Sequence, residues 1–425
     1  MTFAIVAFVV LLLIGVPVAV VMAMAGVAGS YALGGERMIG IIADRMFSGV
    51  SGYMLIAIPY FILTAELMNQ GGLTQKLITF NNALLGRVRG ALSHVNITVS
   101  VFFAGLTGAA ITDTVAIGKI LIPAMKKQGY DASYAAAITA CSSIIGPIIP
   151  PSVVMVVYAT ILRDTSVLDL FAGGIIPGLL MALSLLVMSF ALSWVRNYPK
   201  QEAIALGAAL AAFMAALPAL AVPVIILGGI LSGMTTVTEA SGFAAVYAMA
   251  IGFLFYRNLT WKKVWHSLVV TVRFSGVVFF LLAASAVLSW FVTRSGIARD
   301  AAAMIASVTD YAFLQLMLVS LLLILIGTVI DVLPALVVVA PVLVPALVSL
   351  GFDPLHIAIL MIVTLNVANV TPPVGMSLMT AAWIARVPYE RAIVASLPFY
   401  LSFFAVIVLL ALFPGLSTWI PSLLH

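Results

Sequence analysis

The chain has 425 residues, of which 64% are hydrophobic and 8% are charged, and its mean hydropathy is +1.26. Soluble domains are about half apolar and a quarter charged, so this composition excludes a water-soluble fold and indicates a membrane protein. A single cysteine, Cys141, excludes an intrachain disulfide and a cysteine-based metal site. The net charge of +5 is carried by short loops and is therefore no sign of nucleic-acid binding.

Apolar runs long enough to cross a bilayer occur along the whole chain. The sequence predicts membrane-spanning segments at 3–24, 52–70, 133–160, 167–195, 205–228, 235–256, 268–292, 355–385 and 392–414. Segments 34–48 and 259–270 mix polar and apolar residues, which is typical of amphipathic arms along the membrane interface. Two apolar segments, about 90–124 and 310–346, are interrupted by Gly, Pro and polar residues, and this pattern predicts re-entrant hairpins.

Basic residues predict the orientation of these segments. Most of them fall on one side of the predicted arrangement, at Arg87, Arg89, Lys126, Lys127, Arg196, Lys200, Arg257, Lys262, Lys263, Arg386 and Arg391. Positively charged loops remain in the cytoplasm, so that side is predicted to be cytoplasmic. Both ends of the first hairpin then face the cytoplasm, and both ends of the second face outward.

The two halves of the chain share a pattern of residues at a fixed offset. Gly105 and Gly327 are 222 positions apart (327 minus 105), and the same offset relates other residues: Pro123 to Pro345, Gly129 to Gly351, Asp131 to Asp353, and Pro150-Pro151 to Pro372-Pro373. Five predicted spans separate the two glycines, and an odd number inverts the second copy. We therefore expect one membrane domain, 1–425, made of half-repeats 1–200 and 201–425, an arrangement typical of secondary transporters.

Each Pro-Pro pair interrupts a predicted span. Proline removes a backbone donor and clashes with the preceding turn, so each of these helices is expected to break. A break frees carbonyl oxygens that can coordinate sodium and half-helix N-termini that attract an anionic substrate. One proline alone would more readily indicate a simple kink, whereas two pairs at equivalent positions favour functional breaks.

The motifs around these features resemble the DctM-like large membrane subunit of tripartite ATP-independent periplasmic (TRAP) transporters along nearly the whole chain. The resemblance rests on Ile58–Leu63, Gly105–Asp113, Pro123–Tyr130, Gly146–Ser152, Thr236–Ala240, Gly327–Asp331 and Thr371–Gly375. One departure lies at the first hairpin tip, where this family often has Ser-Gly-Ser-Ala. Here Thr107 keeps a hydroxyl but Ala109 does not, so a role of the second serine is not carried over.

The resemblance implies an all-α polytopic membrane protein with an elevator-type architecture of two hairpins and two broken helices. It implies sodium-driven uptake of an organic acid across the bacterial inner membrane. A periplasmic binding protein would deliver the substrate, and a small four-helix membrane subunit would be the partner. Family members carry C4-dicarboxylates, sialic acid and other sugar acids, and the sequence does not indicate which acid this chain carries.

Two sodium sites are predicted where a hairpin tip meets a break, because sodium prefers oxygen ligands. The candidate residues are Gly105, Thr107, Gly146 and Ile149 for the first site, and Gly327, Thr328, Ala368 and Thr371 for the second. Several of these residues would act through backbone carbonyls. The alternative is that small residues and threonines only allow close helix packing.

Four residues are candidates for substrate contact. Asp113 and Asp331 follow the hairpin tips, where a carboxylate either organises the tip and the field around sodium or hydrogen-bonds the hairpin backbone. Arg294 ends a span and can hold a carboxylate, although it would equally suit the outer surface or a partner subunit. Ser152 follows the first Pro-Pro pair and either donates to substrate or satisfies the broken helix.

Other functions fit less well, and an enzyme is not expected. Gly49-Val50-Ser51-Gly52 matches the short G-x-S-G pattern of rhomboid proteases, but no His lies in an obvious partner helix. An ion channel would show a pore loop rather than a long inverted repeat. The main alternative is a sodium–dicarboxylate symporter of related elevator fold that takes substrate from solution without a binding protein.

Overall fold

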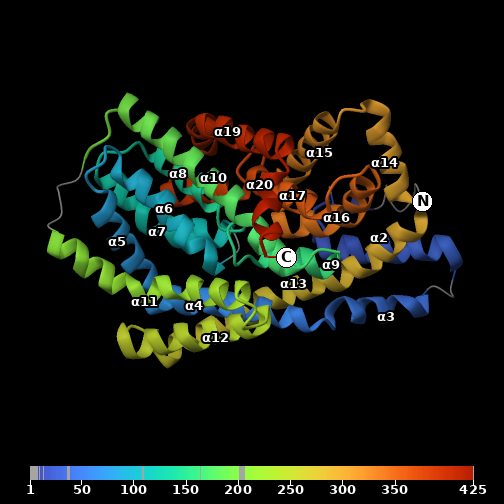
Figure 1. Ribbon diagram of the computed structural model, residues 1–425, viewed down its shortest axis with the longest axis horizontal. Coiled ribbons are helices and arrows are strands. Elements are labelled where there is room, and N and C mark those ends of the chain that lie inside the picture. Colours follow the sequence, from blue (N-terminus) through green and yellow to red (C-terminus); the bar gives the residue numbers. More distant parts are fainter. Residues whose placement is uncertain are drawn as a thin grey trace.

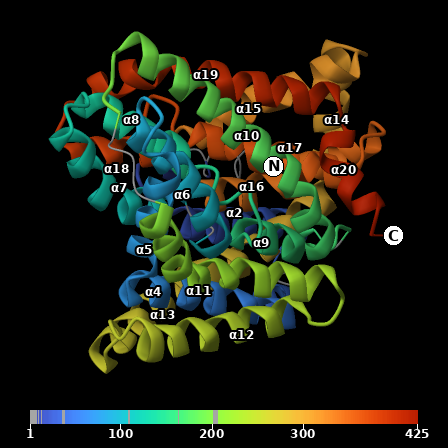
Figure 2. The ribbon, with the colours of Figure 1, turned by 60° about the vertical axis from the view of Figure 1, so that its left-hand side comes forward.

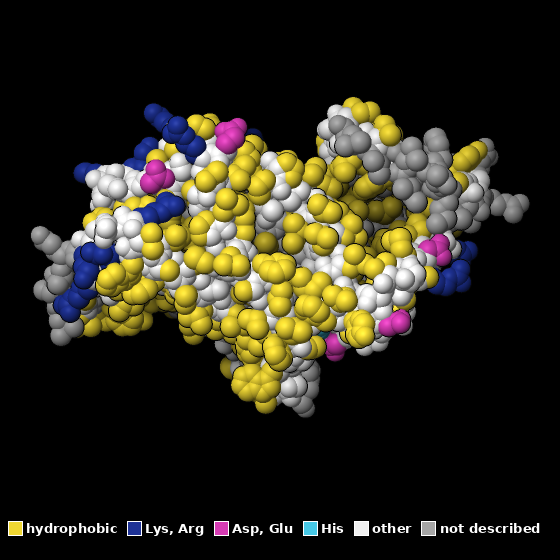
Figure 3. Space-filling model, turned by 90° about the horizontal axis from the view of Figure 1, so that it is seen from above, with side chains coloured by type: hydrophobic (Ala, Val, Ile, Leu, Met, Phe, Trp, Pro, Cys, Tyr) yellow, Lys and Arg dark blue, Asp and Glu magenta, His cyan; other side chains and the backbone are white. Residues whose placement is uncertain are grey.

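The computed structural model describes residues 8, 10–12, 14–35, 39–107, 110–162, 164–200 and 206–424. Regular structure in these residues is helical throughout (Figure 1). By length and composition, six of the described helices can cross a membrane, and a bent pair brings the number to seven. On the face shown in Figure 3, hydrophobic side chains cover the middle and charged side chains lie toward the two ends, as expected for a protein embedded in lipid.

The first hairpin and the first broken helix follow each other in the chain. The hairpin consists of α6 (Ala91–Thr107) and α7 (Ala110–Lys127). The broken helix consists of α8 (Ala132–Ser143) and α9 (Val153–Ile161), separated by the turn that contains the Pro-Pro pair. Both helices of the hairpin pack against α8.

The second half repeats this order. Its hairpin consists of α15 (Ala312–Gly327) and α16 (Val332–Ser349), and its broken helix of α17 (Pro354–Ala368) and α18 (Met376–Ala385). Both hairpin helices pack against α17, as α6 and α7 pack against α8. The predicted hairpins and breaks are therefore present in the structure.

The offset of 222 residues that relates the two halves in sequence also relates their helices. The helix α7 covers residues 110–127 and α16 covers 332–349, so both ends of these helices are related by the same offset. Asp131 caps α8 by accepting from the N–H of Tyr134 at 2.9 Å. Asp353 caps α17 in the same way, by accepting from His356 at 2.9 Å. Equivalent sequence signals thus build equivalent helix starts in the two copies.

Five spans separate the hairpins, as predicted. They are the broken α8–α9, then α10 (Val167–Val195), α11 (Leu206–Leu231), α12 (Val237–Ala250, continued by a π-helical turn to Phe255) and α13 (Trp261–Ser295). This odd number gives the second hairpin the opposite direction through the membrane. The chain ends with α19 (Tyr389–Leu412) and the short α20 (Gly415–Ser422).

A second group of helices forms a layer beside the hairpins and breaks, and we call this layer the scaffold. It contains α2 (Val18–Gly34), α3 (Ile39–Val50), α4 (Ala57–Gly71), α11, α12 and α13. The long α13 packs on α2, α3 and α4, while α12 packs on α4 and α11. In Figures 1 and 2 most of the scaffold lies along the lower side, and the hairpins and broken helices, which we call the transport block, lie above it.

Two predicted segments differ from the structure. The predicted span 3–24 is not one helix, because the chain turns at Ile14 and Gly15 and a new helix, α2, starts after Pro17. Gly15 has a φ of +87°, a conformation that favours glycine. The predicted arm 259–270 is also not separate, since α13 starts at Trp261 with Thr260 as its cap and continues unbroken to Ser295.

The transmembrane helix α10 holds the first break in place through two glycines. A Cβ atom at Gly174 would lie 2.6 Å from the carbonyl oxygen of Ile148 and would also meet the Met155 side chain. A Cβ atom at Gly178 would meet the side chain of Ile149. The absence of side chains at these positions therefore lets α10 contact the backbone of the break directly.

We expect Gly174→Ala to push the break away from α10 and to lower the free energy of unfolding by about 1–3 kcal/mol. Thermal unfolding of the purified protein in detergent would measure this loss as a lower midpoint temperature. Gly228→Ala in α11 is the matched control, because no atom lies within 4 Å of its added Cβ. Both variants gain the same helix propensity, so equal midpoints would contradict the close packing at Gly174.

Candidate functional site

At the first junction between hairpin and break, a carboxylate meets a glycine. Asp113 lies in the first turn of α7 and is fully buried. Its Oδ2 atom occupies the space that a Cβ atom at Gly146 would need. The hairpin acid and the start of the break therefore touch, and any side chain at position 146 would displace the carboxylate.

At the second junction the contacts are more numerous. Asp331, the residue before α16, accepts a hydrogen bond from Nδ2 of Asn369 at 3.1 Å. A Cβ atom at Gly327 would lie 2.6 Å from Cβ of Ala368. The N–H of Gly375 donates to the carbonyl of Thr328 at 3.3 Å. The tip of the second hairpin is thus attached to both ends of the second break.

Four of the predicted sodium ligands have carbonyl oxygens that remain available. Among the described residues, no hydrogen bond is found to the carbonyls of Gly146, Ile149, Gly327 or Thr371. Gly146 and Gly327 are buried, and Ile149 and Thr371 are half-buried. A buried carbonyl without a hydrogen bond is costly, so these oxygens are suited to a cation or an ordered water. The described part of the chain also contains no group of three His, Cys, Asp or Glu side chains that could hold a metal ion.

The other predicted sodium ligands either have carbonyls that already accept a hydrogen bond or have side chains outside the described residues. The carbonyl of Thr328 accepts from Gly375, and that of Ala368 accepts from the N–H of Thr371 at 2.9 Å. The hydroxyls of Thr328 and Thr371 donate to carbonyls of their own helices at 2.8 Å, which leaves their oxygen lone pairs available. Gly105 and Thr107 belong to α6, but their side chains and tip residues 108 and 109 lie outside the described residues.

Ser152 satisfies the broken helix in this structure. It is fully buried, and its hydroxyl donates to the carbonyl of Pro147 at 2.7 Å while accepting from the N–H of Met155 at 3.4 Å. It is the N-cap of α9. Both hydrogen bonds lie within the break, so they support the structural interpretation of this serine.

Arg294 lies away from the junctions. It ends α13 with an exposed side chain, and its guanidinium lies 5.9 Å from the ring centre of Trp290. A second arginine, Arg45 of α3, lies at the same distance from the same ring. Two cations thus share one aromatic side chain, an arrangement that favours a nearby anion.

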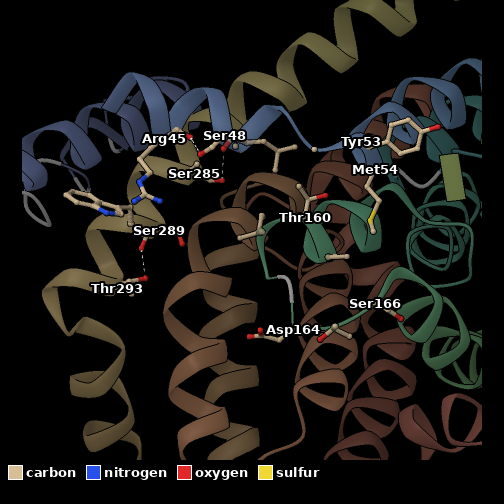
Figure 4. Close-up of a pocket in the computed structure, with 18 of the residues that line it drawn as sticks. Arg45, Ser48, Tyr53, Met54, Thr160, Asp164, Ser166, Ser285, Ser289 and Thr293 are labelled. Carbon is tan, nitrogen blue, oxygen red and sulfur yellow. Dashed lines mark hydrogen bonds between the residues drawn. The ribbon is translucent and has the colours of Figure 1, made fainter. Parts of the chain in front are cut away.

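Arg45 and Trp290 line a cavity of about 1160 Å³ between the scaffold and the transport block (Figure 4). One wall comes from α3 and α13 and contributes Arg45, Ser48, Ser285, Ser289, Trp290 and Thr293. The other comes from α9, the loop after it and the start of α10, with Thr160, Asp164, Ser166 and Asp169. In the predicted orientation these parts belong to the outer half of the membrane, so the cavity lies on the outer side.

The sequence did not indicate Arg45 or Asp164. Arg45 lies in a segment that its mixed pattern assigned to the membrane interface, and Asp164 lies in a short connecting loop. Neither residue belongs to the repeat or to a recognisable motif. Their common position depends on the packing of α3 on α13 and of the transport block on both, which one-dimensional patterns do not contain.

Comparison with known proteins supports the family indicated by these features. The chain matches the tripartite ATP-independent periplasmic transporter, DctM component, over residues 5–416. It is 34% identical to the sialic acid TRAP transporter large permease protein SiaM of Vibrio cholerae, with 91% of this chain and 90% of that protein covered. It is 32% identical to the C4-dicarboxylate TRAP transporter large permease protein DctM of the same species, with 97% and 96% covered.

The fold is similar to that of a solved transporter. The crystal structure of YdaH from Alcanivorax borkumensis superposes with a TM-score of 0.65, covering 90% of this chain and 89% of YdaH at 18% sequence identity. At that identity the likeness concerns the fold alone. The family matches go further, because they extend over nearly the whole chain and include relatives above 30% identity. The chain therefore belongs to the DctM family, the large permease component of TRAP transporters, and is a transport protein rather than an enzyme.

Proposed function

We propose that this chain imports an organic acid together with sodium, as the large permease of a three-part transporter in the bacterial inner membrane. A periplasmic binding protein would deliver the acid, and a small four-helix membrane subunit would complete the transporter. The observation that carries the proposal is the pair of junctions, where a hairpin contacts a break and the contacting segments contain a carboxylate and backbone carbonyls without a hydrogen bond. Oxygen ligands of this kind suit sodium.

The packing of the two junctions supports coupling between the ion and the movement of the protein. Each junction joins a hairpin tip to a broken helix, and both junctions lie within the transport block. Two or more sodium ions bound there would attach each tip to its break and neutralise the carboxylates of Asp113 and Asp331. The block would then move as one body against the scaffold, which is the elevator mechanism.

The carboxylates at the junctions favour movement of the block after sodium has bound. A carboxylate in the membrane is costly unless a cation or a hydrogen-bond donor compensates it. With sodium bound at the junctions, the block carries less uncompensated charge through the apolar part of its path. Without sodium, we expect the movement of a block that holds the anionic substrate to be unfavourable, so the acid would not cross without the ion.

Uptake is expected to need both partners. Proteoliposomes that contain this chain and the small subunit should accumulate a labelled organic acid only when the cognate binding protein is present outside. The reason is that delivery from a closed binding protein, and not free diffusion, would load the transporter. Uptake of free acid by this chain alone would contradict the proposal and favour the self-sufficient symporter.

Uptake is also expected to depend on sodium and on the close contacts at the junctions. Replacement of external sodium by potassium should abolish uptake. Gly327→Ala would press on Ala368 and disturb the carbonyls of the second junction. An overpacking penalty of about 1–3 kcal/mol should raise the sodium concentration for half-maximal uptake by roughly 5- to 150-fold.

Gly276→Ala in α13 is the control for this experiment, because its added Cβ meets no atom within 4 Å. Its sodium dependence should equal that of the unchanged chain. Uptake that follows a proton gradient and ignores sodium would exclude the predicted sodium sites. A normal sodium dependence in Gly327→Ala would show that the second junction is not one of them.

A further inference from the structure

The outer cavity is separate from the two junctions. None of the described residues that line it belongs to a hairpin tip or to a break. Its volume of about 1160 Å³ is larger than the roughly 300–1,000 Å³ of ordinary small-molecule sites. It therefore has room for a substrate the size of a sugar acid together with water.

The scaffold wall of the cavity is cationic. The guanidinium of Arg45 lies over Trp290, and no ion pair to Arg45 is found among the residues that the structure describes. A planar guanidinium binds a carboxylate through two parallel hydrogen bonds. The hydroxyls of Ser285 and Thr293 donate to carbonyls of α13 at 2.9 Å, so toward the cavity they act as acceptors. This wall thus offers one strong carboxylate anchor.

The opposite wall is acidic. Asp164 is exposed to the cavity, and Figure 4 shows it across the cavity from Arg45 and near Ser166. Asp169 accepts a hydrogen bond from the Ser166 hydroxyl at 2.6 Å in the first turn of α10. Thr160 also lines this wall, and its hydroxyl donates to Val156 at 2.8 Å. The carboxylate of Asp164 therefore presents acceptors on this wall, which bind hydroxyl or ammonium groups and repel a second carboxylate.

We propose that the cavity is an outer binding site for an acid with one carboxylate and with hydrogen-bond donors at its other end, such as a polyhydroxy acid. Arg45 binds the carboxylate, and Asp164 with its neighbours binds the hydroxyl groups. A C4-dicarboxylate fits poorly, because its second anion would face Asp164. The proposal rests on the proposed transport function and narrows its substrate class.

The composition of the two walls also gives the site a way to release its ligand. Arg45 and Trp290 belong to the scaffold, whereas Thr160 belongs to α9 of the transport block and Asp164 to the loop that follows α9. When the block moves, the carboxylate anchor separates from the groups that bind the other end. The site holds its ligand only while the two walls face each other as they do in this structure, before the block moves.

Protection of an introduced cysteine tests the site without the need for transport. The native Cys141 is fully buried, so it should not react with a membrane-impermeant maleimide. Thr293→Cys places a thiol in the cavity wall, and Ser307→Cys places one on the exposed surface of α14 (Ile297–Val308). Gluconate and sialic acid should slow labelling of Thr293→Cys, succinate should not, and none of them should affect Ser307→Cys.

Substitution of one charged residue on each wall then tests which end of the ligand that wall binds. Adding Arg45→Gln to Thr293→Cys should raise the half-protecting concentration of gluconate by about 10- to 100-fold, since a hydrogen bond to a charged group is lost. Arg299→Gln, an exposed arginine outside the cavity, is the matched control and should leave protection unchanged. Asp164→Asn should let succinate protect, because the repelling charge is gone.

The outcomes separate this inference from the proposed function. Protection by succinate as strong as that by gluconate in the unchanged cavity would overturn the substrate class. Equal protection in Arg45→Gln and Arg299→Gln would overturn the role of Arg45. If no acid protects Thr293→Cys while sodium-dependent uptake persists, the outer site is wrong and the transport function stands. Loss of sodium dependence with intact protection would instead contradict the proposed function alone.

Discussion

The structure depends on one constraint, which is that a bilayer offers no water to the backbone groups that a broken helix releases. The protein itself has to satisfy them. At the first break, Ser152 does so from within the break. At the second, Tyr400 donates to the carbonyl of Val370 at 2.7 Å, and Tyr389 donates to that of Val374 at 2.5 Å, both from α19. The carbonyls that remain free after these contacts point to the function, because they are available to a bound cation.

This constraint also explains the division of the molecule into two layers. A break surrounded by lipid would expose its backbone, so the hairpins and α10 cover the first break and the second hairpin and α19 cover the second. The scaffold helices contain no Pro-Pro pair: α13 is continuous over 35 residues, and α3 meets the helical segment Tyr53–Gly71 at a bend of 55°. The two breaks and their released backbone groups thus lie in the transport block. The outer cavity lies between the transport block and the scaffold.

Most of the fold could be predicted because it depends on local signals. The Pro-Pro pairs, the glycines and Asp131 with Asp353 fix helix ends in the same way wherever they occur, and the fixed offset makes each copy support the other. The predicted span 3–24 failed because a turn at Gly15 interrupts an otherwise uniform apolar run. The contact between Arg45 and Trp290 could not be predicted from the sequence. The two residues are 245 positions apart (290 minus 45), and only the packing of α3 on α13 brings them together.

The repeat gives the two junctions equivalent backbone positions, but it does not place their acidic side chains at equivalent positions. At the shared offset, Asp113 corresponds to Ala335 and Asp331 corresponds to Ala109, so the two acids reach their junctions from different positions. Asp113 lies against the bare backbone of Gly146, whereas Asp331 is bound by the side-chain amide of Asn369. The two junctions therefore share a repeated backbone but place their carboxylates at non-equivalent positions, so we expect the two proposed ion sites to differ.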